Sequence, residues 1–413
     1  DRVMAIGRNA LYFEDYVLSI QYFNQVINAK PYLSDPYFYR GLAKINLDDF
    51  QGAESDCSEA IERNPFVVSA YQVRGLARIQ QNNFAGAIED YTKALEFDPE
   101  NIGVWHNMAL CRIRQEDYKG AKNDLDKLIA ISPRYTKAYL MRGEVDLKQK
   151  DTLAAEKDFG KAIEIDRYDA DTWASRAILR LQQQRYKDAE ADFDHAIRLS
   201  TRNSGVYINR ALARYHQNNL RGAMSDYDIA LDIDPNNFIG HYNRGLLRAQ
   251  VGDDNRAIQD FNFVIEMEPD NMMAIFNRGL LLDQTGDYKG AIKDYSTVIN
   301  EYPNFLLGYQ YRAQARRKIG DVKGADADEF KVLKAQLDKQ NGVDPNKQTA
   351  DNTENNKTRK KSDKNMNNYR KIVVADNEEG EEKYKSDYRG RVQDKNVNIV
   401  PQPMFVRSEE HTS

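Results

Sequence analysis

The chain has 413 residues, of which 41% are hydrophobic and 30% are charged, and its formal net charge is −5. That charge gives no attractive field for nucleic acid, no run of about 18 apolar residues is present to insert into a membrane, and two cysteines are too few to staple so long a chain. These numbers leave a soluble protein, with two or three domains expected unless the sequence repeats itself.

A repeat of 34 residues runs from the start of the chain to about Lys339 without an insertion or a deletion. We number each repeat from its proline column, so that Pro99 stands at position 0. Position 10 holds only glycine or alanine, and position 22 holds alanine in all nine repeats numbered in this way. The position-22 residues are Ala53, Ala87, Ala121, Ala155, Ala189, Ala223, Ala257, Ala291 and Ala325.

Each repeat is predicted to fold as a helix, a turn and a second helix. Small residues at positions 10 and 22 let two antiparallel helices approach closely, because a larger side chain would overpack by about 1–3 kcal/mol. Aspartate or asparagine at position 18, as in Asp49 and Asn83, is suited to cap the second helix. Within that helix Ala87, Tyr91 and Leu95 recur at the spacing of one helical face. The pattern therefore predicts an all-α array.

The proline, an aromatic residue at position 6, the small residue at position 10 and the alanine at position 22 resemble the pattern of the tetratricopeptide repeat (TPR) family, which has the same period. The resemblance covers residues 1–339 and implies a right-handed superhelix (α-solenoid) of about ten helix-turn-helix repeats. The sequence opens at Asp1 inside a clipped first repeat. A signal peptide is either removed or not included, so both a cytoplasmic and an exported protein are compatible with the sequence.

In a TPR superhelix the first helix of each repeat lines the concave face, so the resemblance implies a groove at positions 4, 7, 8 and 11. Position 8 holds Asn209, Asn243 and Asn277 in three consecutive repeats, with Asn107 as an outlying fourth. Amides both donate and accept hydrogen bonds, so a row of them can bind the backbone of an extended peptide. This row resembles the asparagine ladder of the protein O-GlcNAc transferases. The apolar and aromatic residues predicted beside it are Ile239, Met273, Tyr242 and Phe276.

The alternative interpretation is that these asparagines are polar residues on a solvated helix, and that their apolar neighbours belong to packing between repeats. No catalytic residue, metal site or cofactor is predicted, because none of the five histidines has a metal-ligand spacing and both cysteines are interpreted as small buried hydrophobes. We therefore expect a non-enzymatic scaffold that binds an extended peptide or partner segment in the groove. The alternatives are the substrate-recruiting region of a larger enzyme and an architectural spacer.

The chain departs from the family pattern in two charged columns. Position 9 holds arginine in every repeat except the one with Met108, and position 25 holds aspartate throughout. The two columns form either an anion-binding stripe or, as we favour, an internal ladder of ion pairs. Spacing does not decide whether each arginine meets the aspartate of its own repeat or of a neighbour. Met108 is expected to leave one aspartate, Asp90 or Asp124, without its position-9 arginine.

Beyond Lys339 the period ends. Residues 340–371 are predicted to be a disordered polar linker. Residues 372–406 contain strand-like segments, which either begin a further domain or fold back onto the array and occupy its groove. Residues 407–413, Arg-Ser-Glu-Glu-His-Thr-Ser, are what a widely used sequencing-library adapter encodes in frame, so we hypothesise that they are an assembly artefact.

Overall fold

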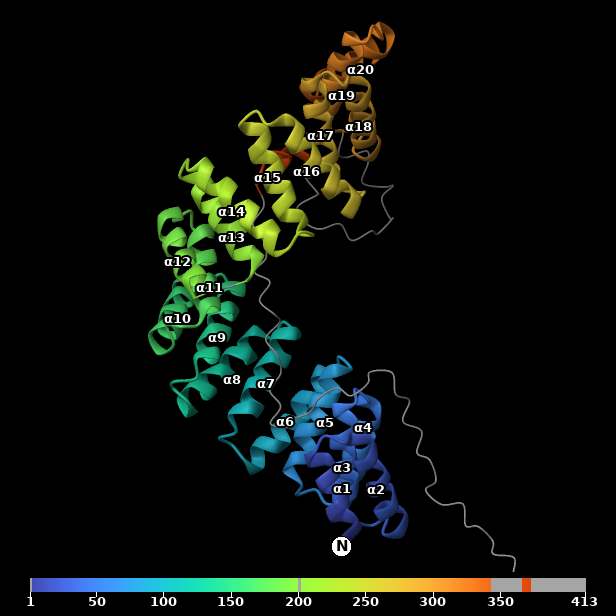
Figure 1. Cartoon of the computed structure of the whole chain (residues 1–413), viewed down its shortest axis with the longest axis vertical. Coiled ribbons are helices and arrows are strands. Elements are labelled where there is room, and N and C mark those ends of the chain that lie inside the picture. Colours follow the sequence, from blue (N-terminus) through green and yellow to red (C-terminus); the bar gives the residue numbers. More distant parts are fainter. Residues whose placement is uncertain (1, 200–201, 343–365, 373–413) are drawn as a thin grey trace, which may run out of the picture. The chain divides into compact units, whose positions relative to one another are not determined.

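The computed structural model describes residues 2–199, 202–342 and 366–372 (Figure 1). The helices of the first half of the array are α1 (Arg2–Tyr12), α2 (Tyr16–Ala29), α3 (Asp35–Asn46), α4 (Phe50–Arg63), α5 (Val68–Gln80), α6 (Phe84–Phe97), α7 (Ile102–Arg114), α8 (Tyr118–Ile131), α9 (Thr136–Lys148) and α10 (Thr152–Ile165). Those of the second half are α11 (Ala170–Gln182), α12 (Tyr186–Arg198), α13 (Ser204–His216), α14 (Leu220–Ile233), α15 (Phe238–Gln250), α16 (Asp254–Met267), α17 (Met272–Thr285), α18 (Tyr288–Glu301), α19 (Leu306–Lys318) and α20 (Val322–Gln340).

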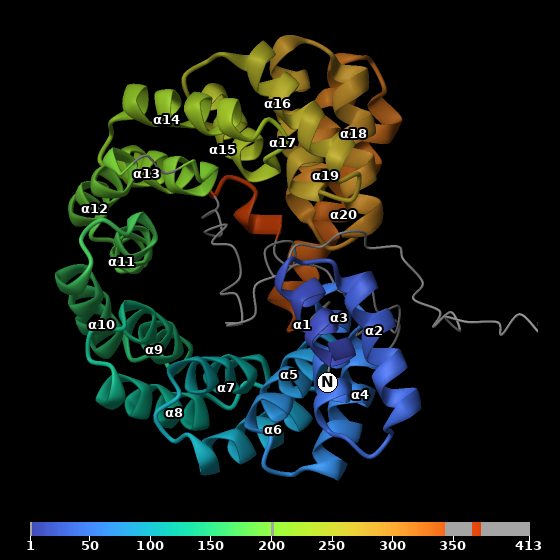
Figure 2. The same ribbon diagram turned by 60° about the horizontal axis from the view of Figure 1, so that its bottom comes forward.

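These helices form ten consecutive pairs, each with one repeat's first and second helix, and the described ranges contain no strand. The predicted all-α array of about ten helix-turn-helix repeats is confirmed. In Figure 2 the first helices α13, α15 and α17 lie on one side of their layer, and the second helices α14 and α16 lie on the other. A short 3-10 helix, η2 (Met366–Asn368), lies on the side of the first helices and contacts α17.

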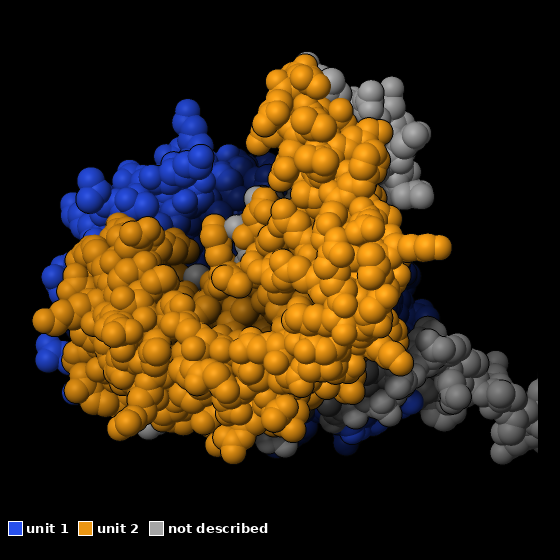
Figure 3. Space-filling model, turned by 90° about the horizontal axis from the view of Figure 1, so that it is seen from above, with its two compact units in different colours: residues 1–168, 380–413 blue, residues 169–379 orange. Residues whose placement is uncertain are grey.

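The array divides into two compact units, which we describe separately (Figure 3). Helices α1 to α10 belong to the first unit, within residues 1–168. Helices α11 to α20 and η2 belong to the second unit, within residues 169–379.

The turn inside each repeat has the same backbone geometry throughout the array. The residue at position 17 has a positive φ in all ten repeats, and it is glycine in the last three. These residues are Glu14, Asp48, Asn82, Glu116, Lys150, Gln184, Asn218, Gly252, Gly286 and Gly320. The next residue caps the second helix as predicted: Asp49, for example, accepts a hydrogen bond from the backbone N–H of Gly52 at 2.9 Å. Asp253 makes no such bond and instead lies 3.6 Å from Arg256.

The small columns mark where the two helices of a repeat meet. All nine position-22 alanines are fully buried. A Cβ atom added at Gly41 would lie 3.3 Å from the carbonyl oxygen of Ala53, and one added at Gly143 would lie 2.6 Å from the Phe159 ring. The helices are therefore too close for larger side chains at these positions.

The arginine and aspartate columns form ion pairs inside each repeat. Arg210 is representative: its Nε and Nη2 donate to Asp226 at 3.0 and 2.6 Å, and its Nη1 donates to Asp194 at 2.8 Å. The paired aspartate lies 16 residues after the arginine, and the second acceptor lies 16 residues before it in the preceding repeat. The pairs are Arg40–Asp56, Arg74–Asp90, Arg142–Asp158, Arg176–Asp192, Arg210–Asp226, Arg244–Asp260, Arg278–Asp294 and Arg312–Asp328.

This geometry answers the question that spacing left open, since each arginine binds the aspartate of its own repeat. Of the two aspartates that Met108 was expected to affect, Asp90 is bound by Arg74, whereas Asp124 lacks a position-9 arginine and is bound by Arg112 at 2.8 Å instead. Arg112 belongs to a second basic column, at position 13, that the sequence analysis missed. Its members that bind the same aspartates are Lys44, Arg78, Arg112, Arg180, Arg214, Arg248 and Arg316.

The pKa of a buried aspartate depends on the hydrogen-bond donors around it. Burial raises the pKa of Asp124 to about 6, and Arg112 offsets that rise only in part. Burial also acts to raise the pKa of Asp260, but hydrogen bonds from His241 and Arg244 outweigh it and hold that pKa below its ordinary value.

A matched pair of glycines tests the close approach. Gly143→Leu is expected to destabilise the chain by about 1–3 kcal/mol, because its side chain would collide with Phe159. Gly160→Leu is the control, since a Cβ atom there meets nothing within 4 Å and leucine favours a helix by several tenths of a kcal/mol or more over glycine. Urea denaturation followed by circular dichroism measures both. Equal stability of the two variants would contradict the proposed contact.

The repeat that contains Met108 and Asp124 predicts that the stability of the fold depends on pH. Because the folded-state pKa of Asp124 is raised to about 6 from 3.8, its contribution to stability is complete below about pH 4 and is lost as the pH rises through 6. Met108→Arg supplies the missing guanidinium and should lower this pKa, which shrinks the stability difference between pH 4.5 and pH 7 by on the order of 1 kcal/mol. Urea unfolding at both pH values measures it, with Asp124→Asn as the non-titrating control. An unchanged difference in Met108→Arg would refute this account.

Candidate functional site

The structure gathers seven of the eight residues predicted for the groove in the second unit. Asn209 lies on α13, Ile239, Tyr242 and Asn243 lie on α15, and Met273, Phe276 and Asn277 lie on α17. These are the first helices of three consecutive repeats.

Asn107 lies apart from the other three asparagines, on α7 of the first unit. Its Nδ2 lies 3.5 Å from the hydroxyl of Tyr91, to which it donates inside the array. The other asparagines are also buried: Asn209 and Asn243 are 0% exposed and Asn277 is 5% exposed. They are therefore not polar residues of a solvated helix, and burial of an amide requires hydrogen-bond partners.

A segment from far along the chain, Met366–Ile372, contacts the predicted residues. The hydroxyl of Tyr242 and Nδ2 of Asn277 both donate to the backbone carbonyl oxygen of Tyr369, at 2.8 and 2.6 Å. The Tyr369 ring meets the Phe276 ring edge to face, with centroids 4.8 Å apart. One amide and one hydroxyl thus donate to the same backbone carbonyl, and the Phe276 ring packs against the side chain of that residue.

The same segment packs through residues spaced three apart. Met366 and Tyr369 are buried in the cluster that includes Tyr242, Met273 and Phe276, whereas Ile372 packs against a cluster formed by α11, α12 and α13. Residues 366–371 were predicted to belong to a polar linker. Met366 and Tyr369 are nevertheless buried, because the array supplies apolar residues for them to pack against. Ile372, predicted in a strand-like segment, has no regular secondary structure. Residues 343–365 of the predicted linker, residues 373–406 of the predicted strand-like part and residues 407–413 lie outside the described residues.

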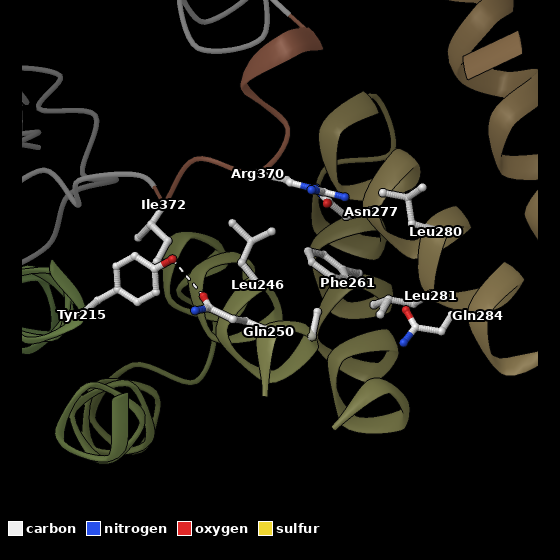
Figure 4. Close-up of a pocket in the computed structure, with 11 residues that line it drawn as sticks. Tyr215, Leu246, Gln250, Phe261, Asn277, Leu280, Leu281, Gln284, Arg370 and Ile372 are labelled. Atoms are coloured by element: carbon white, nitrogen blue, oxygen red, sulfur yellow. Dashed lines mark hydrogen bonds between the residues drawn. The ribbon is translucent and has the colours of Figure 1, made fainter. Parts of the chain in front are cut away.

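A pocket of about 390 Å³ opens beside the bound tyrosine (Figure 4). Its apolar lining comes from Leu246, Ala249, Phe261, Leu280, Leu281 and Ile372, and its polar lining from Tyr215, Gln250, Asn277, Gln284 and Arg370. Figure 4 shows Arg370 next to Asn277 at one side of the pocket, and the Tyr215 hydroxyl, which donates to Gln250 at 2.8 Å, at the other. The pocket can hold an apolar side chain with polar groups around its edge.

Burial raises the pKa of the Tyr369 phenol above its ordinary value, while the charge of Arg370 acts to lower it and Tyr311 acts to raise it. A phenol is neutral at pH 7 even without this shift, so the hydroxyl of Tyr369 is protonated. Across residues 2–199, 202–342 and 366–372 the structure places no group of three histidine, cysteine, aspartate or glutamate side chains that could hold a metal ion. None of the helices in these ranges is long and apolar enough to span a bilayer.

The sequence analysis missed Tyr369, Arg370 and the pocket residues of α15 and α17. The signal that could have found the segment is the spacing of Met366, Tyr369 and Ile372 within a polar stretch. A spacing of three over seven residues is too short to stand out alone.

Family models described as tetratricopeptide repeat match residues 102–135, 136–169, 175–238 and 242–304, and one described as TPR repeat matches 75–111. Together they match more than half of the chain. This chain is a tetratricopeptide repeat protein. TPR arrays are in general protein-interaction scaffolds, and this array is of that general kind. A search of curated proteins found no match.

Several solved TPR structures are similar to this chain. The C-terminal part of a TPR protein from Cytophaga hutchinsonii has a TM-score of 0.48 at 18% identity, covering 57% of this chain and 97% of that one. A TPR protein from Parabacteroides merdae has a TM-score of 0.47 at 21% identity, with coverages of 60% and 98%. YrrB, described as a TPR protein with an unusual peptide-binding site, has a TM-score of 0.37 at 20% identity, with coverages of 45% and 95%.

The hydrogen bonds to Tyr369 predict protection of the segment from protease. Asn277→Ala or Tyr242→Phe is expected to raise the rate of tryptic cleavage after Arg370 and Lys371 roughly fivefold to tenfold, because each removes a bond of about 1 kcal/mol and raises the undocked population. Mass spectrometry of the two cleavage sites measures the rates. Asn107→Ala is the control, since its amide bonds inside the first unit. Wild-type rates in Asn277→Ala and Tyr242→Phe would contradict the docking.

Proposed function

We propose that this TPR array is a non-enzymatic scaffold that binds an extended segment of a partner protein along α13, α15 and α17, and that its own residues 366–372 occupy this groove in the absence of the partner. The observation that carries the proposal is the convergence of Tyr242 and Asn277 on the carbonyl oxygen of Tyr369. Every residue of a peptide has such a carbonyl, so these donors suit a segment of varied sequence.

The spacing of the array supports an extended segment. Packed helices lie on the order of 10 Å apart, and an extended chain advances about 3.3 Å per residue. Residues three apart in an extended stretch therefore meet successive repeats, whereas Met366 and Tyr369, which are joined by the 3-10 helix η2, pack in the same cluster. Tyr369 contacts α15 and α17, and Ile372, three residues later, packs on the cluster that includes α13. Asn209 and Asn243, at the same repeat position as Asn277, continue the row of amides in that direction.

The tether makes the internal segment a strong competitor. A segment on the same chain has an effective concentration in the millimolar range, so a few hydrogen bonds and buried side chains suffice to keep it in place. An external partner must overcome this advantage. Its apparent affinity equals its affinity for the open groove multiplied by the fraction of chains whose groove is open. The partner proposed here is a protein and not nucleic acid, since the net charge of −5 is unfavourable for nucleic acid.

A peptide library panned on the full chain tests the proposal. Tyr369→Ala keeps the backbone carbonyl but removes the ring that packs against Phe276, so the internal segment should leave the groove more often and this variant should retain peptides more strongly than wild type. Adding Asn277→Ala and Tyr242→Phe should weaken their binding about tenfold or more, since two hydrogen bonds of about 1 kcal/mol are lost. Asn107→Ala should leave binding unchanged. If no peptide is retained, or if retention is insensitive to Asn277 and Tyr242, the proposed function is wrong.

A further inference from the structure

The internal segment fills one part of the groove and leaves another part open. Tyr369 is buried against Phe276, and its carbonyl is held by two donors. The next residue, Arg370, is exposed, and the pocket of about 390 Å³ opens beside it. Figure 4 shows its guanidinium at the edge of the pocket, beside Asn277, with Leu246 and Leu280 farther along the lining.

The chemistry of Arg370 does not match the apolar part of that lining. Leu246, Phe261, Leu280 and Leu281 offer an apolar surface, and burying a guanidinium against it without an anion is unfavourable. The guanidinium carbon instead lies 5.3 Å from the centre of the Tyr369 ring. A large apolar side chain at the same position of a bound segment would remove this surface from water.

From this mismatch we infer that the partner segment carries a tyrosine followed directly by a large apolar residue, such as leucine or tryptophan, with further apolar residues three before and three after the tyrosine. The tyrosine occupies the site of Tyr369, the residue after it enters the pocket, and the outer two replace Met366 and Ile372. This inference rests on the proposed function and adds the sequence that the groove selects.

The inference also explains how a partner displaces a tethered segment. With arginine after the tyrosine, residues 366–372 do not place an apolar side chain in the pocket, and the tether adds to the contacts of Met366, Tyr369 and Ile372. A partner that fills the pocket as well gains affinity that the internal segment does not have. The internal segment thereby excludes ligands that do not fill the pocket and is displaced by a partner that does.

Two labelled peptides test the inference by fluorescence anisotropy on full-length Tyr369→Ala. One has the sequence of residues 366–372, Met-Asn-Asn-Tyr-Arg-Lys-Ile, and the other has leucine in place of the arginine. The leucine peptide should bind roughly tenfold more tightly, as expected for the burial of one leucine side chain. A peptide with alanine at this position removes the charge without filling the pocket, and it should gain much less. Replacing the peptide tyrosine with alanine should abolish binding of either.

A pocket-filling variant locates the effect. Ala249→Leu, added to Tyr369→Ala, occupies the pocket from α15 and should cancel the advantage of the leucine peptide while leaving the arginine peptide unaffected. In the otherwise wild-type chain, Arg370→Leu should slow tryptic cleavage after Lys371 about tenfold, because the internal segment then fills its own pocket.

The outcomes separate this inference from the proposed function. Equal affinity of the two peptides, or an advantage that persists in Ala249→Leu, overturns the inference. Library peptides that need Asn277 but lack a tyrosine also overturn it, and they leave the proposed function standing. Failure of the library and of both peptides to bind Tyr369→Ala overturns both.

Discussion

The close approach of the two helices in each repeat is the constraint on which the other contacts depend. At Gly41 a Cβ atom would lie 3.3 Å from the backbone of Ala53, and this small separation brings Arg40 within reach of Asp56. A buried carboxylate without a cation would be costly, whereas a bidentate arginine satisfies both of its oxygens. The helix pairing therefore decides where charges can be buried, and the bidentate pairs form across the two helices in this alignment.

The groove uses the same repeat in a different way. The first helices place one residue of each kind at regular intervals, so Asn209, Asn243 and Asn277 fall in a row without any long-range design. Selectivity enters where the repeats differ, as with Tyr242 and Phe276 around the bound tyrosine. The repeat thus places asparagine at the same position in three consecutive first helices, whereas Tyr242 and Phe276 distinguish the place where Tyr369 lies.

The fold was largely predictable because its determinants recur every 34 residues, and each recurrence supports the others. The left-handed turn residue was not predictable, since Glu14, Lys150 and Gly252 share a backbone conformation and nothing else. In the candidate site, the asparagine row and its aromatic neighbours followed from the repeat. Their contact with Tyr369 did not, because it joins residues 92 and 127 positions apart and involves one occurrence that no period can reveal.

The spacing of the arginine contacts has a consequence for the gain or loss of whole repeats during evolution. Because Arg210 contacts residues 16 positions before and 16 positions after itself, every ladder contact spans less than one repeat. Unequal recombination that inserts or removes one whole repeat of 34 residues would join compatible helices and re-form the ion pairs at the new junction. Array length can therefore vary during evolution without a compensating substitution in the ladder, whereas the site that binds Tyr369 takes Tyr242 from one repeat and Asn277 from the next, so a junction between these two repeats would divide it.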